Sequence, residues 1–497
     1  MRASRPGPGA TAVIIPVAIG YLGICLLIGV WAARRTRTAT DFFIAGKGIG
    51  LWPLAIASMA ATLSGFAFIG GPGLIYSVGN GALFIVLPAA ITGALSAWML
   101  GSRMRLLGEV RGLMTVPDAI GARYRSSAAQ GLSAVAILVA TVGYLATNLL
   151  ALGLIVDAIF HTGLPAAIVI GAAVVVAYSA AGGILAGIYT DLFQGAIMAL
   201  ASTLVFAAAM ASGGGLGEIS RTILAHEPIL LGPWGKFTPL AALSFFFVFA
   251  LGTLGQPHVI HKYYMLRDPR RLRWFPLLMT GAMVVTLLLY FGVGVAIKAA
   301  VLRGDVPPLA KGDDATPTFL LRYTAPWLAG LVFSGVAAAI MSTVNSFFSV
   351  GAAAITHDLP VAFGRRTTNE LRGGRIATLA LALLATLLAL GSGQAVALLG
   401  VFGWGLFAST LVPALAIGLN WPGATRKGAL ASIGVGLVTT LLFETLAWAK
   451  AYTFPAGVTV SGLSLILAMA TFFAVSWLTR DEAEGDLDAD VRVIIES

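Results

Sequence analysis

The chain has 497 residues, of which 58% are apolar and only 10% are charged, and its mean hydropathy is +0.92. Soluble domains carry about 25% charged residues, so this composition excludes a soluble globular protein and indicates a polytopic helical membrane protein. The formal charge of +10 comes from Lys and Arg in short loops between apolar segments, where they mark topology and not nucleic-acid binding. The single cysteine, Cys25, excludes a disulfide framework.

Apolar segments long enough to span a bilayer recur along the whole chain. The first is too long for the core of a signal peptide and no clear cleavage site follows it, so we interpret it as a retained helix. The thirteen predicted spans are 11–33, 50–77, 81–102, 126–158, 163–181, 188–211, 238–261, 275–300, 324–356, 374–391, 394–420, 428–449 and 458–479.

Lys and Arg are distributed unevenly between the alternating loops. With the N-terminus outside, the inner loops carry 22 of these residues and the outer loops carry 9. The positive-inside rule therefore predicts a multi-pass protein of the cell (inner) membrane, with the N-terminus outside and the C-terminus cytoplasmic. We expect His261 and Lys262 to mark the cytoplasmic end of their span. The acidic tail, 480–497, is expected to be a solvated, mobile end.

Two long spans are interrupted near their middle by Gly, Pro or Ser. The second span contains AATLSGFAFIGGPG and the seventh contains FALGTLGQPHVIHKYY. The two interruptions lie five spans apart along the chain, as expected for two five-helix repeats of opposite orientation that each begin with a broken helix. This pattern is typical of secondary transporters. The alternative is that both are ordinary kinked helices, because Gly and Pro are frequent in membrane spans.

Polar side chains inside the spans are candidate binding groups. Tyr144 and Asn148 are i, i+4 neighbours on one face of the fourth span, and a polar pair that bonds to another helix is the alternative. Asp191 opens the sixth span, where a carboxylate is a functional candidate. The alternative is that Thr190 and Asp191 cap their helix.

The ninth span, within SGVAAAIMSTVNSFFSVGAAAITHD at 334–358, has the most polar face. Ala339, Ser342 and Thr343 stand at i, i+3 and i+4, so a helix places them on one face. Hydroxyl and carbonyl oxygens are hard ligands that suit small cations. The alternative is that these small and hydroxyl residues hold helices together.

Six motifs in order resemble the sodium:solute symporter family over residues 11–450. They are DFFIAGKGIG (41–50), TVPDAIGARY (115–124), YSAAGGILAGIYTDLFQG (178–195), GQPHVIHKYYMLRD (255–268), AAAIMSTVNS (337–346) and TRKGALASIGVG (425–436). The resemblance implies an all-α polytopic membrane protein with the inverted five-helix repeat of the leucine-transporter type and about 13 transmembrane helices.

The same resemblance divides the chain into six parts. They are the N-terminus, first helix and loop (1–49), the first repeat (50–211), an extracellular loop (212–237), the second repeat (238–420), two additional helices (421–479) and the tail (480–497).

The resemblance also implies a central sodium site between the first broken helix and the ninth span. Its ligands would be the carbonyls of Ala60, Leu63 and Ala339 and the hydroxyls of Ser342 and Thr343. Unwinding at 60–65 would free such carbonyls, and an oxygen set without a carboxylate suits a monovalent ion. A second sodium site would use Asp191, Asn345 and Ser346 together with Ser342.

The solute site implied by the resemblance lies between the two broken helices. Its residues would be Gln256, His258, Tyr144, Asn148, Ser64, Phe68 and Trp404. The Gln-Pro-His sequence is more similar to the proline, pantothenate and organic-acid branches than to the sugar branch. For the aromatic residues, ordinary packing is the alternative.

These observations predict a sodium-coupled symporter that imports a small organic solute, a monocarboxylate or an amino acid, by alternating access. The alternatives are a proton-coupled or sugar-type symporter of the same fold, or a transporter-like sensor or channel. The chain has no GxxxxGK[ST] nucleotide motif and no recognisable catalytic constellation, so we expect neither a pump nor an enzyme. The expected partners are Na⁺, the solute and the lipid bilayer, with no nucleic acid; the oligomeric state is left open.

Overall fold

The structure, a computed structural model, describes residues 8–35, 38, 43–365, 369–392, 396–455, 457–483 and 487–496. The regular structure of these residues is helical, apart from a single β-bridge between Ile49 and Leu266. The predicted extracellular residues 1–7 and most of the loop 36–42 lie outside this described part.

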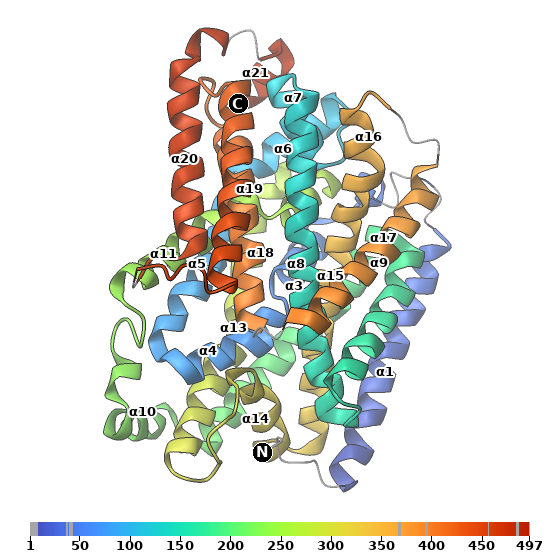
Figure 1. The fold of residues 1–497 in the computed structure, drawn as a ribbon. Coiled ribbons are helices and arrows are strands. Elements are labelled where there is room, and N and C mark those ends of the chain that lie inside the picture. Colours follow the sequence, from blue (N-terminus) through green and yellow to red (C-terminus); the bar gives the residue numbers. More distant parts are fainter. Residues whose placement is uncertain are drawn as a thin grey trace.

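The α-helices are shown in Figure 1. They are α1 (Pro8–Ala33), α3 (Leu51–Thr62), α4 (Gly71–Val78), α5 (Leu83–Ser96), α6 (Ser102–Val110), α7 (Val116–Tyr124), α8 (Ser127–Phe160), α9 (Leu164–Ser212), α10 (Leu216–His226), α11 (Pro239–Gly252), α12 (Pro257–Ile260), α13 (Phe275–Leu302), α14 (Ala315–Tyr323), α15 (Pro326–Ala353), α16 (Leu359–Ala362), α17 (Glu370–Ser392), α18 (Val396–Leu411), α19 (Arg426–Trp448), α20 (Val460–Leu478) and α21 (Ala489–Glu496).

Among the described residues, ten helices are long and apolar enough to cross a membrane, or eleven if the bent pair around Gln256 is counted as one span. The predicted number of about 13 therefore stays a prediction. The two predicted spans 163–181 and 188–211 both lie within α9.

Both predicted helix breaks are confirmed. α3 ends at Thr62, Leu63 has an extended backbone, and a π-helical turn over Phe66–Gly70 leads into α4. α11 runs into a short 3₁₀ turn, Gln256 is extended, and α12 begins at Pro257 with a 40° change of direction. Pro257 has no backbone N–H to donate, so the ladder of helical hydrogen bonds is interrupted there. Irregular backbone at membrane depth requires protein or water around it, which makes both breaks candidate binding positions.

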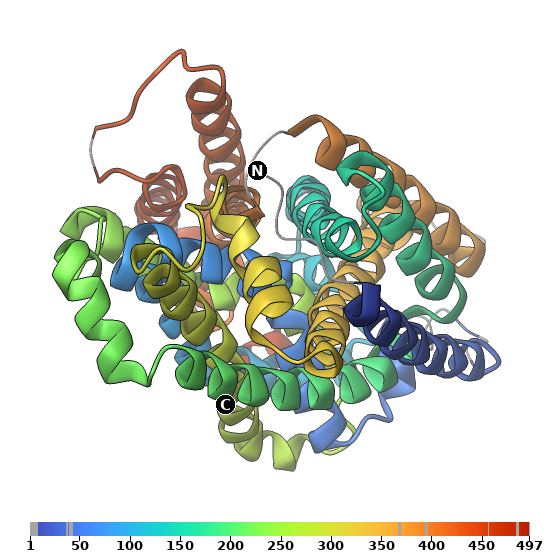
Figure 2. The same cartoon turned by 90° about the horizontal axis from the view of Figure 1, so that it is seen from below.

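α15 lies in the interior of the bundle, and nearly all of its residues are buried. It packs most extensively on α9 and also contacts α1, α3, α8 and α17. Figures 1 and 2 show α1 and α9 side by side along one flank of α15. Small residues let helix backbones approach closely in membranes. Gly335 illustrates this, because a Cβ there would lie 3.2 Å from the side chain of Ala201 on α9.

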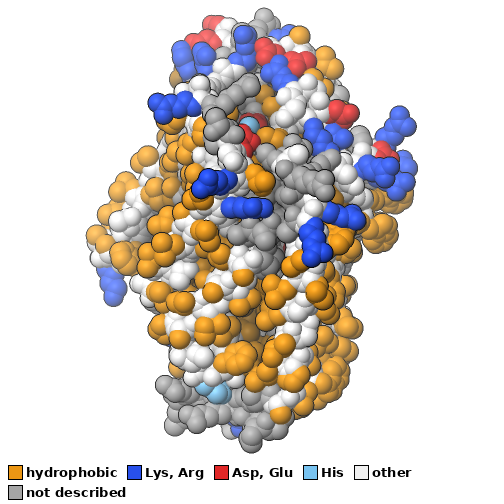
Figure 3. Space-filling model, turned by 90° about the vertical axis from the view of Figure 1, so that its right-hand side faces the viewer, with side chains coloured by type: hydrophobic (Ala, Val, Ile, Leu, Met, Phe, Trp, Pro, Cys, Tyr) orange, Lys and Arg blue, Asp and Glu red, His pale blue; other side chains and the backbone are white. Residues whose placement is uncertain are grey.

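The surface separates into an apolar flank and a charged end. Figure 3 shows hydrophobic side chains over much of one face, whereas Lys and Arg gather in its upper half. α1 begins near the lower end in Figure 1, and α21 lies at the upper end. This distribution is the one expected for a bundle whose middle is surrounded by lipid.

The tail was predicted to be a mobile end, but in the structure its helix α21 is packed against the rest of the protein. α21 packs on α6, and the side chains of Val491, Ile494 and Ile495 are buried. Arg111 binds Asp490 through Nε–Oδ2 (2.7 Å) and also Asp488 (2.7 Å), and its hydrogen bond lowers the pKa of Asp490. Alternating acidic and apolar residues let this segment fold against a basic surface. Tail residues 484–486 and 497 lie outside the described part of the chain.

Candidate functional site

The end of α3 meets the polar face of α15. The Thr343 hydroxyl lies 2.9 Å from the carbonyl oxygens of both Ala61 and Ala339 and donates to them. Ala60, Ala339, Ser342 and Thr343 are completely buried. The structure thus brings the α3 break beside the predicted hydroxyls, and it adds the Ala61 carbonyl, which the sequence did not single out. Neutral oxygens converging in this way are able to hold a monovalent cation; the individual ligand assignments stay predictions.

Asp191 lies on the α9 side of α15. It is inside α9 and completely buried, so it does not cap the beginning of a helix. Asn345 and Ser346 are also buried, and a Cβ at Gly187, one turn before Asp191, would lie 2.1 Å from Asn345 Nδ2. Asp191 Oδ1, Ser346 Oγ and both polar atoms of the Asn345 amide have no hydrogen-bond partner among the described residues. The residues of the predicted second site are therefore gathered at one contact between helices.

The sequence predicted that Lys262 marks the cytoplasmic end of its span, but the structure buries it inside the bundle. Its side chain is completely buried, and Nζ lies 3.0 Å from Asp191 Oδ2 and 2.8 Å from the carbonyl oxygen of Ala57. His261 is likewise buried, with only 2% of its surface exposed. The signal that could have revealed Lys262 is Asp191 itself, because a carboxylate inside a membrane span usually has a basic partner.

α8 supports the first break with two polar side chains. Asn148 Oδ1 accepts a hydrogen bond from the Gly65 N–H (3.0 Å), and its amide nitrogen donates to the carbonyl oxygen of Tyr144 (2.8 Å). The Tyr144 hydroxyl lies 3.4 Å from Ser64 Oγ. Three predicted solute residues, Ser64, Tyr144 and Asn148, therefore form one connected group at the break.

The second break reaches the same region through aromatic contacts. The His258 ring lies 4.2 Å from the Phe347 ring and 6.4 Å from the Tyr144 ring, measured between centroids. Gln256 Nε2 donates to the carbonyl oxygen of Gly252 (3.1 Å). Within the described part of the chain, the buried atoms Gln256 Oε1 and His258 Nδ1 have no hydrogen-bond partner. Phe347 was not predicted, and its apolar side chain gave no sign of this role.

A small cavity of about 30 Å³ lies beside the first break. Its walls contain Tyr144 and Trp404, and Trp404 stacks on Phe249 (5.1 Å between ring centroids). The complete lining is Thr62, Leu63, Phe66, Ala67, Ile85, Tyr144, Phe249, Met283, Gly400 and Trp404. The other five predicted solute residues are not part of this lining; they are Ser64, Phe68, Asn148, Gln256 and His258. The Phe68 carbonyl oxygen instead accepts a hydrogen bond from Thr316 (2.7 Å). The cavity is enclosed mainly by apolar side chains.

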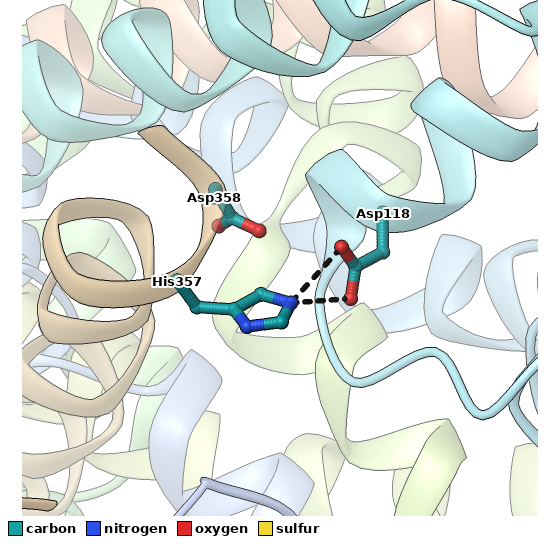
Figure 4. Close-up of side chains that lie close together, drawn as sticks. All are labelled: Asp118, His357 and Asp358. Atoms are coloured by element: carbon teal, nitrogen blue, oxygen red, sulfur yellow. Dashed lines mark hydrogen bonds and ion pairs between the residues drawn. The ribbon is translucent and has the colours of Figure 1, made fainter. Parts of the chain in front are cut away.

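A separate cluster of Asp118, His357 and Asp358 joins α7 to the end of α15 (Figure 4). His357 Nε2 lies 3.2 Å from both carboxylate oxygens of Asp118, and Nδ1 lies 3.3 Å from Glu370 Oε1. Asp358 accepts a hydrogen bond from Thr115, whose hydroxyl also caps α7. Because these polar groups already have protein partners, the cluster is a polar link between segments.

Comparison with known proteins agrees with this geometry. The model of the sodium:solute symporter family matches residues 42–436. The osmoregulated proline transporter OpuE of Bacillus subtilis is 29% identical over 95% of this chain and 96% of its own length. The sodium/pantothenate symporter of Escherichia coli is 27% identical over 87% and 91%, respectively.

A solved structure of a Na⁺-coupled sialic acid symporter in a substrate-bound outward-open state superposes with a TM-score of 0.74. It is 18% identical and covers 93% of this chain and 98% of its own. A closed nucleobase-cation-symport-1 family transporter gives a TM-score of 0.53, at 17% identity and over 90% and 98% of the two chains. These likenesses confirm the all-helical fold of the leucine-transporter type.

Proposed function

Because the chain belongs to the sodium:solute symporter family, we propose that it imports a small amino acid or monocarboxylate by alternating access. It is a sodium-coupled solute symporter of the membrane, with Na⁺ as the coupling ion. The members of this family are transporters. The class of solute, the ligands of the ion and the orientation in the membrane are the parts that we propose.

The single observation that carries the solute class is the wall of the cavity. All ten lining residues are uncharged, and Phe66, Phe249 and Trp404 form a stack along one side. A solute with a large net charge would find no balancing side chain there, whereas a compact zwitterion could lay its apolar part against the rings. A carboxylate can be held by free N–H groups at a broken helix without a buried Arg.

The relatives support the same class. Proline and pantothenate, named for two of them, both bear a carboxylate. His258 and Gln256 at the second break, and Ser64, Tyr144 and Asn148 at the first, are the proposed polar contacts of the solute. The sugar-type alternative has no comparable support.

For the ion, we propose the carbonyls of Ala60, Leu63 and Ala339 and the hydroxyls of Ser342 and Thr343. The support is that the carbonyl oxygen of Ala61, between Ala60 and Leu63 at the end of α3, lies within hydrogen-bond distance of the Thr343 hydroxyl. An ion bound there would tie the first broken helix to α15, and it would shift the conformational equilibrium only through its different affinities for the two access states.

We propose an N-terminus outside and a C-terminus in the cytoplasm of the cell (inner) membrane. The distribution of Lys and Arg, 22 against 9, supports this orientation. The charged end in Figure 3 would then face the cytoplasm.

The test is uptake of a panel of labelled solutes by proteoliposomes that contain the purified protein. We expect at least one amino acid or monocarboxylate to accumulate under an inward sodium gradient, and not under an equal potassium or proton gradient. Competition by hexoses, without any effect of amino acids or monocarboxylates, would contradict the proposed solute class while leaving sodium coupling intact.

A further inference from the structure

Lys262 and Asp191 form an ion pair in the interior of the helix bundle. Nζ of Lys262 lies 3.0 Å from Asp191 Oδ2, and neither side chain is exposed. The ammonium also donates to the carbonyl oxygen of Ala57, 2.8 Å away. Lys262 follows α12, Asp191 belongs to α9 and Ala57 belongs to α3, so this one cation contacts three separate segments.

The polar face of α15 lies on the same side as the Asp191 carboxylate. Ser342, Asn345 and Ser346 stand at i, i+3 and i+4, and Ser342 lies within interaction range of the Asp191 carboxyl. The hydroxyls of Ser342 and Ser346, the Asn345 amide and Asp191 Oδ1 have no hydrogen-bond partner of normal geometry in the described part of the chain. Hard oxygens beside a carboxylate are the ligands that an alkali cation prefers.

The charges decide what this oxygen set is able to hold. Among the ion pairs of the described residues, Lys262 is the partner of Asp191, and the two charges cancel. A sodium ion beside the same carboxylate would add a positive charge close to the ammonium. Like charges repel strongly where water cannot screen them, and an unbalanced buried charge is costly. The sodium ion is therefore excluded while the ammonium remains.

We propose that the Lys262 ammonium is a tethered cation that takes the place of a second sodium ion at Asp191. The symporter then binds one sodium ion, between α3 and α15, and Lys262 is the residue that sets the ion stoichiometry. This inference rests on the central sodium site of the proposed function. A pair with only a structural role would hold the three segments together without changing the number of bound ions.

The experiment counts sodium ions bound to the purified full-length protein, by equilibrium binding of radioactive sodium. We expect one ion per chain for the wild type and for Lys262→Arg, which keeps the positive charge. We expect two ions for Lys262→Met, because the unbranched apolar side chain leaves the Asp191 carboxylate free. Lys298→Met is the matched control, since Lys298 is also nearly buried and pairs with Glu227 away from α15; one ion is expected.

A second set of variants locates each ion. Thr343→Ala is expected to bind none, whereas Thr343→Ala combined with Lys262→Met is expected to bind one, at Asp191. If Thr343→Ala keeps its ion and Lys262→Met still gains one, the inference stands and only the central site is wrongly placed.

Two results would overturn the inference. One is two sodium ions in the wild type, where Lys262 is present. The other is a single ion in a folded Lys262→Met protein that elutes as the wild type does in size-exclusion chromatography. Should Lys262→Met fail to fold, Lys262→Gln keeps a hydrogen-bond donor to Asp191 without the charge; two ions are expected for it, and one ion overturns the proposal.

Discussion

The two faces of α15 meet their neighbours with different chemistry. Toward α3, the Thr343 hydroxyl meets the carbonyl oxygens of Ala61 and Ala339, and no formal charge is involved. Toward α9, Asn345 and Ser346 accompany Asp191, which carries a full charge that Lys262 balances. Ser342 stands between the two faces, because this proposed ligand of the central ion also lies within interaction range of the Asp191 carboxyl. A neutral oxygen set can gain and lose a monovalent ion without leaving an unpaired charge on the protein. The oxygens beside Asp191 already have Lys262 as a balancing charge, so a further cation there would leave one positive charge unbalanced and would cost free energy. One helix can therefore carry an exchangeable site and a fixed one, a single turn apart.

The largest effect is expected from removing a charge on the side of α15 that meets Asp191 and Lys262, which we call the charged face. The side that meets α3 is the neutral face. Asp191→Asn leaves the Lys262 ammonium buried without a counter-ion, and such a change costs about 3–5 kcal/mol. Thermal unfolding in detergent, followed by tryptophan fluorescence, should show a large fall in the midpoint temperature. The double variant Asp191→Asn, Lys262→Met removes both charges, so its midpoint temperature should return most of the way to that of the wild type. An equal loss in the single and the double variant would show that the pair is not what stabilises this contact.

The second effect concerns the neutral face. Ser342→Ala with Thr343→Ala removes two hydroxyl ligands, each worth about 1.5–3 kcal/mol toward a charged group. The sodium concentration for half-maximal transport should rise by about a hundredfold or more, since 1.4 kcal/mol corresponds to a factor of about ten. Ser349→Ala is the control, because that hydroxyl donates to the carbonyl oxygen of Asn345 in its own helix (3.1 Å). Wild-type sodium dependence of the double variant would contradict the placement of the site.

A third prediction tests how closely α9 must approach the charged face. A Cβ at Gly187 would lie 2.1 Å from Asn345 Nδ2, so Gly187→Ala should overpack the contact and cost about 1–3 kcal/mol. Gly20→Ala in α1 is the matched control, because no atom lies within 4 Å of its added Cβ. Combining Gly187→Ala with Asn345→Ala makes room and should restore part of the midpoint temperature. If the two glycine variants are equally stable, the Asn345 amide moves aside at little cost and does not limit how closely α9 packs.

The smallest effect is expected at Glu227, whose carboxylate is about 30% exposed and pairs with the nearly buried Lys298. Glu227 binds Lys298 (2.6 Å) and Lys236 (3.0 Å), and the hydrogen bond from Lys298 is the main reason that its pKa lies below the ordinary 4.5. Water screens this pair, so we expect about 1 kcal/mol or less. Because the folded pKa is lowered, the stabilisation is complete above the ordinary value and is lost as pH falls through the lowered one.

The measurement for Glu227 is the difference in midpoint temperature between the wild type and Glu227→Gln across that acidic range. The difference should shrink as pH falls. A difference that stays constant would mean that the carboxylate does not act through its charge.

The sequence predicted the features that depend on local pattern. Gly and Pro interrupt the helices where Leu63 and Gln256 are extended in the structure, because these residues weaken helical hydrogen bonding wherever they stand. The spacing of Ala339 and Thr343 likewise fixed their shared face, since any helix places i and i+4 together. Membership of the family and sodium coupling followed from six such local patterns taken together.

What the sequence did not predict depends on contacts between distant segments. Lys262 and Asp191 are 71 positions apart, and a lysine after an apolar run is more often a marker of the membrane surface. The tail was expected to be mobile because its charges suit water, but Arg111, directly after α6, forms ion pairs with Asp488 and Asp490. The aromatic stack of Phe66, Phe249 and Trp404 brings together three helices whose local sequences are ordinary apolar runs.

The docking of α21 on α6 has a consequence for how the chain is made. Arg111 and Asp490 are separated by 379 residues, so at about 5–20 residues per second roughly 20 to 75 s of translation pass between them. During that time the charge of Arg111 is not neutralised by the tail, and it remains able to act as a topogenic signal for the spans beside it. The ribosome supplies the acidic segment that neutralises Arg111 only after the intervening residues have been made.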